Sequence, residues 1–268
     1  MKKEIDSNTP VMKQFLDVKD KYNDSIVLFR MGDFYETFLN DAILTSQILG
    51  IVLTKRANGK AADVDLAGFP HHALDNYLPK LVKAGHRVAI CEQVEDPKMA
   101  KGIVKREVVE VVTPGTLTSD RTLNDRSNRY IGSILSIKQY SGFSFLDSST
   151  GEFYIGECDN NILNSFLIKF RPQEIIVSEK AKYATSNWYM EFQPFMSRVD
   201  DWMFDHDSAY RVLIKHFEVK TLKGFGCQNM KVGICAAGAL ANHMQTNLSS
   251  SLKHVSKLSP VIGEGVMG

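Results

Sequence analysis

Phe34 and Glu36 are the two side chains of this 268-residue chain whose types and spacing most strongly suggest a binding site. They lie in segment 30–38, which reads RMGDFYETF and follows a short apolar run. Gly32 can turn the chain there and Asp33 can cap a helix, so we expect a helix to start at Phe34. An aromatic ring and a carboxylate in the first turn of a helix are an unusual pair to leave near the surface.

The same spacing also fits an ordinary packing role. Asp33 followed three residues later by Glu36 resembles a capping box with Asp in place of Ser or Thr. Both carboxylates would also suit the positive end of the helix dipole. Phe34 and Phe38 would share one helical face with Ala42, so both rings could belong to the core. Spacing alone therefore favours packing over binding.

Signals for catalysis are weak in this chain. Gly59-Lys60 lacks the rest of the G-x-x-x-x-G-K-[ST] pattern, so we predict no ATP-binding loop. Asp147 ends an expected strand and could serve a ribonuclease H-like nuclease, but such enzymes need several acids around two metals. It also precedes a Ser-Ser-Thr-Gly turn that it can cap. No Cys-x-x-Cys spacing occurs, and adjacent His71 and His72 would point apart, so we expect neither a catalytic nor a metal site.

Composition indicates a globular protein, with 44% hydrophobic and 24% charged residues and enough length for two domains. The sequence has no run of 18 apolar residues, and its first residues lack the apolar stretch of a signal peptide. We therefore expect a reduced, cytoplasmic protein with no membrane partner. Residues 1–115 hold 16 Lys and Arg against 16 Asp and Glu, so net charge does not indicate nucleic-acid binding. A neutral domain can still bind DNA through one basic face.

The first 112 residues alternate predicted strands and helices, which indicates an α/β domain with a mixed sheet. We expect helices from Thr9-Pro10 and over 34–49 and 72–83, and strands at 26–29, 51–54, 64–67, 87–92 and 105–112. Pro79 should kink or break the helix over 72–83. Residues 55–63 should form a polar loop that turns at Asn58-Gly59.

The second half of the chain has a different order of elements. Residues 113–128 are polar and contain Pro114-Gly115, which is typical of a linker between domains. Three hairpin-connected strands and an α/β alternation follow: strands 130–137, 142–147, 152–157 and 174–177, and helices 162–170, 210–217 and 232–244. This order resembles a ribonuclease H-like sheet. The pattern is lost from about Ser249.

Blocks of sequence in a fixed order resemble the MutS family of DNA mismatch repair proteins. After segment 30–38 they are LTKR (53–56), AGFPHHA (67–73), LV (81–82), VAICEQ (88–93), DP (96–97), VTPGT (112–116), LD (146–147), Gly151, GFG (224–226) and CAAG (235–238). The resemblance implies a mismatch-recognition domain over 1–112, a linker over 113–128 and a ribonuclease H-like connector domain over 129–252. Residues 253–268 would begin a further domain, so we expect this chain to be the N-terminal portion of a longer protein.

The resemblance gives Phe34 and Glu36 a role that spacing alone does not. It implies that Phe34 enters the minor groove and stacks beside a mispaired or unpaired base, which kinks the duplex. Glu36 would hydrogen-bond the exposed base edge. Met31 and Asp33 flank the pair and could touch the groove, while core packing and helix capping stay open as their alternatives.

Lys55 and Arg56 lie in the expected polar loop, where they could contact DNA phosphates or remain solvated charges. For the longer protein the resemblance implies a homodimer that clamps mismatched double-stranded DNA, with ATP and Mg in an ATPase domain outside this chain. It also implies a MutL-type partner at the connector and a bacterial cytosolic, nucleoid-associated location. The chain itself should be no enzyme. Two other functions stay open: a protein-interaction scaffold with Phe34 in its core, and a nuclease centred on Asp147.

Overall fold

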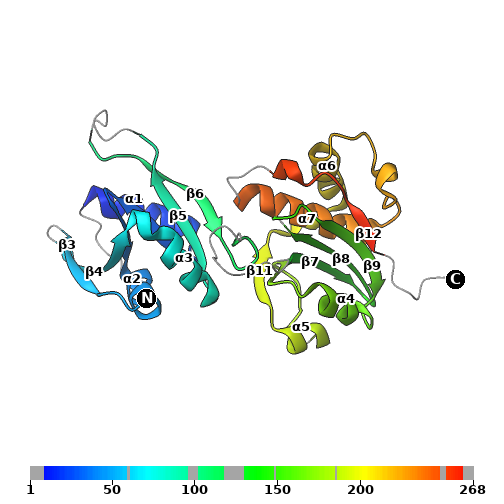
Figure 1. The fold of residues 1–268 in the computed structure, drawn as a ribbon, viewed down its shortest axis with the longest axis horizontal. Coiled ribbons are helices and arrows are strands. Elements are labelled where there is room, and N and C mark those ends of the chain that lie inside the picture. The colour runs from blue at the N-terminus through cyan, green and yellow to red at the C-terminus, as the bar shows by residue number, and fades with distance from the viewer. Residues whose placement is uncertain are drawn as a thin grey trace. The chain divides into compact units, whose positions relative to one another are not determined.

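The structure is a computed structural model, and it describes residues 9–58, 61–95, 102–117, 130–147, 149–184, 186–247 and 252–261. The chain forms two compact units, residues 1–123 and residues 124–268 (Figure 1). Each unit is a mixed α/β structure built on its own six-stranded sheet, which confirms the predicted fold class. Within the described ranges, none of the helices combines the length and the apolar character that crossing a membrane requires.

The sheet of the first unit has the strand order β3-β4-β2-β1-β5-β6. Only β1 and β5 pair in parallel, and the other neighbours are antiparallel. The elements are α1 (Pro10–Lys21), β1 (Ser25–Met31), β2 (Phe34–Phe38), α2 (Leu39–Leu49), β3 (Thr54–Asn58), β4 (Ala61–Pro70), η1 (His71–Ala73), α3 (Leu74–Lys83), β5 (Arg87–Gln93) and β6 (Arg106–Val112).

Helices cover both faces of this sheet. Phe15 of α1 packs on one face against the rings of Phe29 and Phe38, with centroids 5.8 and 4.9 Å away. Leu78 and Leu81 of α3 pack on the other face, together with the end of α2. Alternation along the strands therefore decides which side chains reach each core.

Segment 34–38 is the main correction to the sequence analysis, because it forms strand β2 and not the first turn of a helix. Met31 pairs with Phe34 across a two-residue turn in which Gly32 has φ of +59°, a conformation that favours glycine. The other edge of β2 pairs with β4, where Glu36 lies opposite Gly68. Helix α2 begins only after Phe38, so Asp33 does not cap it. Backbone hydrogen bonds to β1 on one edge and β4 on the other hold residues 34–38 as a strand, although the spacing of their apolar side chains also fits a helix.

Three smaller expectations for the first unit were also wrong. Residues 51–53 lie outside regular structure, and the strand begins at Thr54 and continues to Asn58 through the expected loop. Gly59, the second residue of the expected turn, lies outside the described residues. Pro79 is buried within α3, and the helix runs from Leu74 to Lys83 without the break that we gave as one of two expected outcomes.

The sheet of the second unit has the order β11-β10-β7-β8-β9-β12. β7, β8 and β9 form an antiparallel meander, and β10, β11 and β12 each pair in parallel. The elements are β7 (Tyr130–Ile137), β8 (Tyr140–Asp147), β9 (Phe153–Asp159), α4 (Leu163–Phe170), β10 (Glu174–Ser178), α5 (Asn187–Phe192), β11 (Phe195–Val199), η3 (Asp201–Phe204), α6 (His206–His216), η4 (Leu222–Phe225), α7 (Lys231–Asn247), η5 (Leu252–His254) and β12 (Ser259–Val261). The meander and its following alternation were predicted, whereas α5, β11 and β12 were not.

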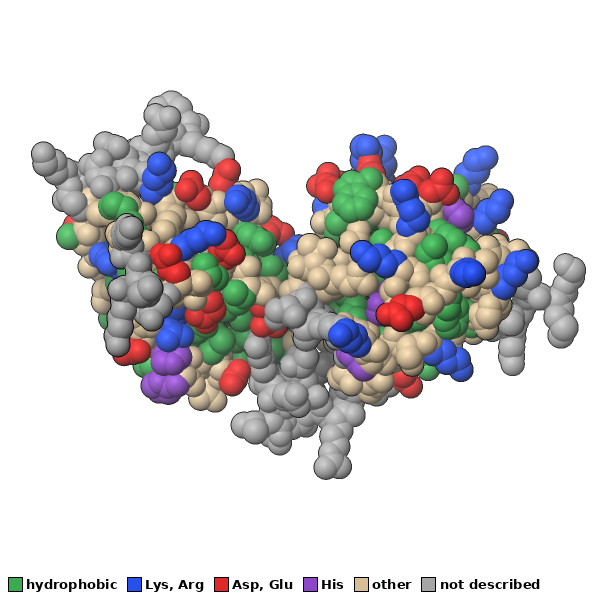
Figure 2. Space-filling view, turned by 90° about the horizontal axis from the view of Figure 1, so that it is seen from above, with side chains coloured by type: hydrophobic (Ala, Val, Ile, Leu, Met, Phe, Trp, Pro, Cys, Tyr) green, Lys and Arg blue, Asp and Glu red, His purple; other side chains and the backbone are tan. Residues whose placement is uncertain are grey.

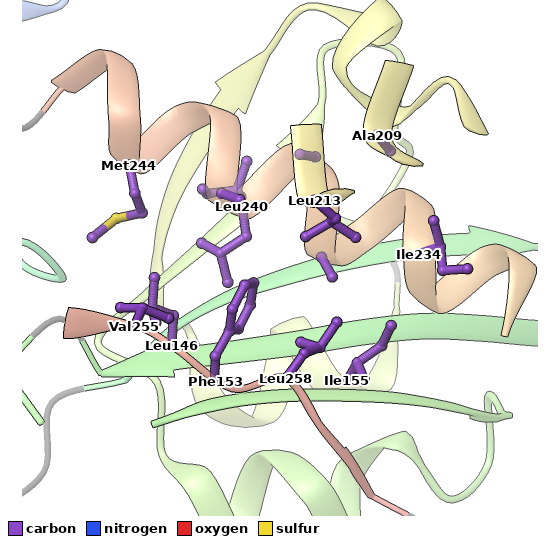
Figure 3. Close-up of a cluster of buried hydrophobic side chains, with 14 of the residues drawn as sticks. Leu146, Phe153, Ile155, Ala209, Leu213, Ile234, Leu240, Met244, Val255 and Leu258 are labelled. Carbon is purple, nitrogen blue, oxygen red and sulfur yellow. The ribbon is translucent and has the colours of Figure 1, made fainter. Parts of the chain in front are cut away.

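Helices also enclose this second sheet, with α6 and α7 on one face and α4 and α5 on the other (Figure 1). Figure 3 shows Phe153 and Ile155 of β9 pointing toward Leu240 and Ile234 of α7. Leu258 reaches the same core from the end of the chain.

The described residues 113–117 of the expected linker are packed into the first unit, and residues 252–261 are packed into the second unit. Thr113 and Leu117 are buried, and Leu117 belongs to a core of the first unit. β12 pairs with β9, so described residues 252–261 belong to the second unit although we expected residues 253–268 to begin another domain.

Candidate nucleic-acid interface

Phe34 is a large apolar side chain that the fold leaves at the surface. It follows the Gly32-Asp33 turn as the first residue of β2, and 46% of its area is exposed. Phe38, four residues along the same strand, is buried against α1. The sequence analysis considered that both rings could be core, and the structure buries only the second.

Glu36 lies on the same face of β2 as Phe34, because side chains two residues apart on a strand point the same way. Its strand partner is Gly68, where a Cβ would come within 2.9 Å of the Tyr35 carbonyl oxygen and 3.4 Å of Glu36 Cγ. The missing side chain of Gly68 therefore leaves room beside the carboxylate.

Glu36 forms an ion pair with Arg56, with 2.7 Å between Nη1 of the guanidinium and Oε2 of the carboxylate. Its guanidinium lies over the Phe38 ring, 6.0 Å from the centroid, as it extends from β3 toward β2. Burial raises the pKa of Glu36, and the charges of Arg56 and Arg106 oppose that rise. The carboxylate is thus partly desolvated, and these two cations offset part of the effect of burial on its pKa.

The opposite face of β2 fixes the strand that carries the pair. The Tyr35 hydroxyl donates a hydrogen bond to Glu92, and Arg30 lies 3.9 Å from the same carboxylate. Burial is the main cause of the raised pKa of Tyr35, so the phenol stays a donor at neutral pH. Tyr35 also packs against Phe69 of β4. Phe34 and Glu36 therefore project from a rigid element.

Met31 and Asp33 flank the turn in different environments. Met31 is partly buried against the core that includes Phe15, which matches the packing alternative. Asp33 is exposed, and its carbonyl oxygen accepts a hydrogen bond of 2.8 Å from the backbone N–H of His71. Lys55 is exposed on β3 and next to Arg56, so the structure brings five of the six predicted residues onto β1, β2 and β3 and the sixth into the turn between them.

A shallow groove of about 540 Å³ connects the exposed ring with the chain that precedes β3. Its lining consists of Phe34, Glu36, Gly50, Ile51, Val52, Thr54, Leu66 and Gly68. Charged side chains of both signs are mixed over the visible described surface of the first unit (Figure 2). The site is therefore apolar, with one carboxylate and nearby cations, and not a uniformly basic patch.

Asp147 in the second unit caps the turn that follows β8, as one of its two sequence-based interpretations predicted. It is buried, and its Oδ1 accepts hydrogen bonds from the Ser149 N–H at 2.8 Å, the Ser149 hydroxyl at 2.6 Å and the Thr150 N–H at 3.3 Å. Among the described residues, no group of three or more His, Cys, Asp and Glu side chains is placed to hold a metal ion.

Sequence reasoning missed three contributors to the site: Gly68, Arg106 and the segment 50–52. The Ala-Gly-Phe-Pro block contains Gly68, but its position opposite Glu36 depends on the register of β2 and β4. Arg106 comes from β6, 70 positions after Glu36 in the chain. A reading of FYETF with a period of two residues would have placed Phe34, Glu36 and Phe38 on one face.

Comparison with known proteins identifies both units. Residues 9–121 match the family model for MutS domain I, and residues 128–256 match that for MutS domain II. The DNA mismatch repair protein MutS of Porphyromonas gingivalis is 46% identical over 251 residues, which is 94% of this chain and 28% of that protein. The MutS proteins of Parabacteroides distasonis and Flavobacterium johnsoniae are 47% and 44% identical, over 94% and 97% of this chain and 29% and 30% of their own length. The chain thus spans less than a third of these relatives.

Proposed function

The chain belongs to the MutS family of DNA mismatch repair proteins, and we propose that it binds double-stranded DNA at a mismatched or unpaired base. Phe34 is the wedge in this proposal and Glu36 the group that contacts the exposed base. The exposed ring of Phe34, on a rigid strand and on the same face as Glu36, is the observation that carries it. A protein-interaction scaffold with Phe34 in its core does not account for that exposure.

Insertion of Phe34 selects DNA by its deformability. A ring that enters the minor groove unstacks one base step, which costs a few kcal/mol in sound DNA and less where pairing is already faulty. No base sequence has to be read for this selection. The proposal therefore accounts for recognition of many kinds of mismatch in any sequence context.

Glu36 adds discrimination through its charge. Its ion pair with Arg56 has to open before the carboxyl group can reach a base, and Arg56 is then free to contact a phosphate group. A protonated carboxyl group can donate to a base acceptor, and burial favours that form of Glu36. An ionised carboxylate instead repels a well-stacked duplex. Lys55, Met31 and Asp33 complete the proposed contact surface.

The functions of the longer relatives extend the proposal beyond this chain. We infer a dimeric protein that acts in the bacterial cytosol near the nucleoid and binds ATP and Mg in a domain outside these 268 residues. The second unit would contact a MutL-type partner. The chain by itself would bind DNA without turnover.

Binding of this chain at low salt to a duplex with one unpaired thymine, and to its perfect match, tests the proposal. We expect a preference for the bulged duplex that Phe34→Ala abolishes. Trp202→Ala is the matched control, because Trp202 is an exposed aromatic residue of the second unit. Equal binding of both duplexes by the unsubstituted chain would reduce the interaction to phosphate contact and contradict the proposal.

A further inference from the structure

Residues 51–53 are an apolar segment, Ile-Val-Leu, in which Ile51 packs partly buried against a core of the first unit and the next two side chains lie at the surface. Val52 has 77% of its area exposed, the highest value among the large hydrophobic side chains in the described part of the chain. Leu53 is also exposed. Such a run would ordinarily form a buried strand, so its exposure needs another cause.

The backbone of this segment is held in place at both ends. Gly50, with φ of +67°, ends α2 and donates its N–H to the Ser46 carbonyl oxygen at 2.9 Å. The Ser46 hydroxyl donates to the Ile51 carbonyl oxygen at 2.7 Å. Thr54 then pairs with Leu66 in the β3–β4 ladder. Val52 is therefore presented on a fixed backbone.

The segment borders the groove that Phe34 and Glu36 also line. Ile51 and Val52 form part of the lining on the side of α2, and Leu66 and Gly68 of β4 contribute between them and β2. The exposed apolar surface thus continues from the ring of Phe34 to the side chain of Val52.

We propose that residues 50–54 are a second DNA contact, in which Val52 packs against the deoxyribose faces of the minor-groove wall beside the step that Phe34 enters. This inference rests on the proposed function, since it takes the groove beside Phe34 as part of the DNA-binding surface. Its ligand is the apolar sugar edge of a kinked duplex and not a base.

Two features favour DNA as the ligand of residues 50–54: their groove is shared with Phe34, and two cations follow them on β3. The wall of the minor groove has to lie within reach of any surface adjacent to the inserted ring, and kinking opens that groove. Lys55 and Arg56 follow the segment directly on β3, where cations can meet the phosphates outside the same wall. Val52 would contact sugars that only the kinked duplex presents, so its contribution should favour the bulged DNA.

Val52→Ser in the 268-residue chain tests this contact, with the bulged and perfect duplexes already described as probes. Val109→Ser is the matched control, because Val109 is an exposed valine on β6 of the same unit. We expect Val52→Ser to weaken binding of the bulged duplex about fivefold, because the substitution removes an apolar side chain that the DNA would partly cover. The affinity for the perfect duplex should change by less than about twofold. Thermal unfolding should be the same for all three proteins.

Different results separate the two proposals. If Phe34→Ala abolishes the preference while Val52→Ser behaves like Val109→Ser, the second contact is wrong and the wedge stands. If the unsubstituted chain binds both duplexes equally or not at all, both proposals fail for this chain. If Val52→Ser changes only self-association in sedimentation, the segment is an interface between copies and not a DNA contact.

Discussion

The two units use aromatic and acidic side chains in opposite ways. In the second unit, the Phe145 ring is fully buried and stacks on Phe170, with centroids 4.5 Å apart. The Asp147 carboxylate there accepts three hydrogen bonds from its own turn. In the first unit, Phe34 is exposed, and Glu36 is half-buried in an ion pair with Arg56, whose side chain is 40% exposed.

This difference shows where each unit can act on a ligand. Groups that a core or a turn already satisfies cannot leave without a cost in stability. An exposed ring gains free energy when a partner covers it, and a partly exposed ion pair opens at a smaller cost than a buried one. The arrangement around β2 is therefore suited to binding, whereas the arrangement around β8 is suited to holding a fold together.

Matched truncation of the two phenylalanines should give the largest effect. Phe145→Ala removes a fully buried ring and should lower the free energy of unfolding of the second unit by about 4 kcal/mol, with the preference for bulged DNA unchanged under folding conditions. Phe34→Ala should change stability by less than about 1 kcal/mol and remove the preference. Denaturant unfolding and DNA titration of both variants measure this contrast. A large loss of stability in Phe34→Ala would remove the distinction between the two rings.

The sequence predicts the elements that a short local pattern determines, and it fails for those that depend on residues far away in the chain. β1, β5 and the β7–β9 meander follow from short patterns, and all were predicted. β2 has only five residues, too few to separate a period of 2 from one of 3.6. Its partners on β4 lie about 30 positions away, so the ladder that makes it a strand is invisible locally.

The candidate site was predicted by residue type more than by geometry. Phe34 and Glu36 were chosen through a family resemblance, and the helix expected for them was wrong. The ion pair between Glu36 and Arg56 joins two strands that do not neighbour each other in the sheet, and no spacing rule predicts it. The exposed segment 51–53 was predicted as a strand because hydrophobicity does not reveal which runs the fold leaves uncovered.

Removal of the Asp147 carboxylate should have the next largest effect. Asp147→Ala removes the buried acceptor of three hydrogen bonds from Ser149 and Thr150, whose exposed donors can turn to water, so the free energy of unfolding of the second unit should fall by about 1 kcal/mol. DNA discrimination by the folded protein should not change. Metal-dependent nucleic-acid cleavage that Asp147→Asn abolishes would instead establish a catalytic acid and make the second unit an active site.

The Glu36–Arg56 pair should show a smaller coupling that depends on pH. A double-mutant cycle with Glu36→Gln and Arg56→Met should give about 0.5 kcal/mol at neutral pH, because both side chains are partly exposed. Burial raises the pKa of Glu36, so the folded state holds its proton to higher pH than the unfolded state and stability falls as pH rises through this interval. Arg56→Met removes an opposing charge, so the fall should extend to higher pH.

Glu36→Gln is the control for this pH dependence, since it has no carboxyl group to titrate. Urea unfolding from pH 4 to pH 8 should show the extended fall in Arg56→Met and not in the double variant. If Arg56→Met and the double variant have the same pH profile, the Glu36 carboxyl group contributes nothing to the pH dependence of stability, which would contradict the rise in its pKa on burial.

Lys55 should give the smallest effect, because a solvent-exposed cation contributes to phosphate contact alone. Lys55→Met should weaken binding of the bulged and perfect duplexes by the same factor and reduce the slope of log affinity against log salt by about 1. Lys83→Met, which removes an exposed cation from the end of α3, should leave that slope unchanged. A titration series in salt separates these cases. If Lys55→Met instead reduced the preference for the bulged duplex, the discriminating surface would extend beyond the face of Phe34 and Glu36, because phosphate contact by itself cannot tell a mismatch from its perfect match.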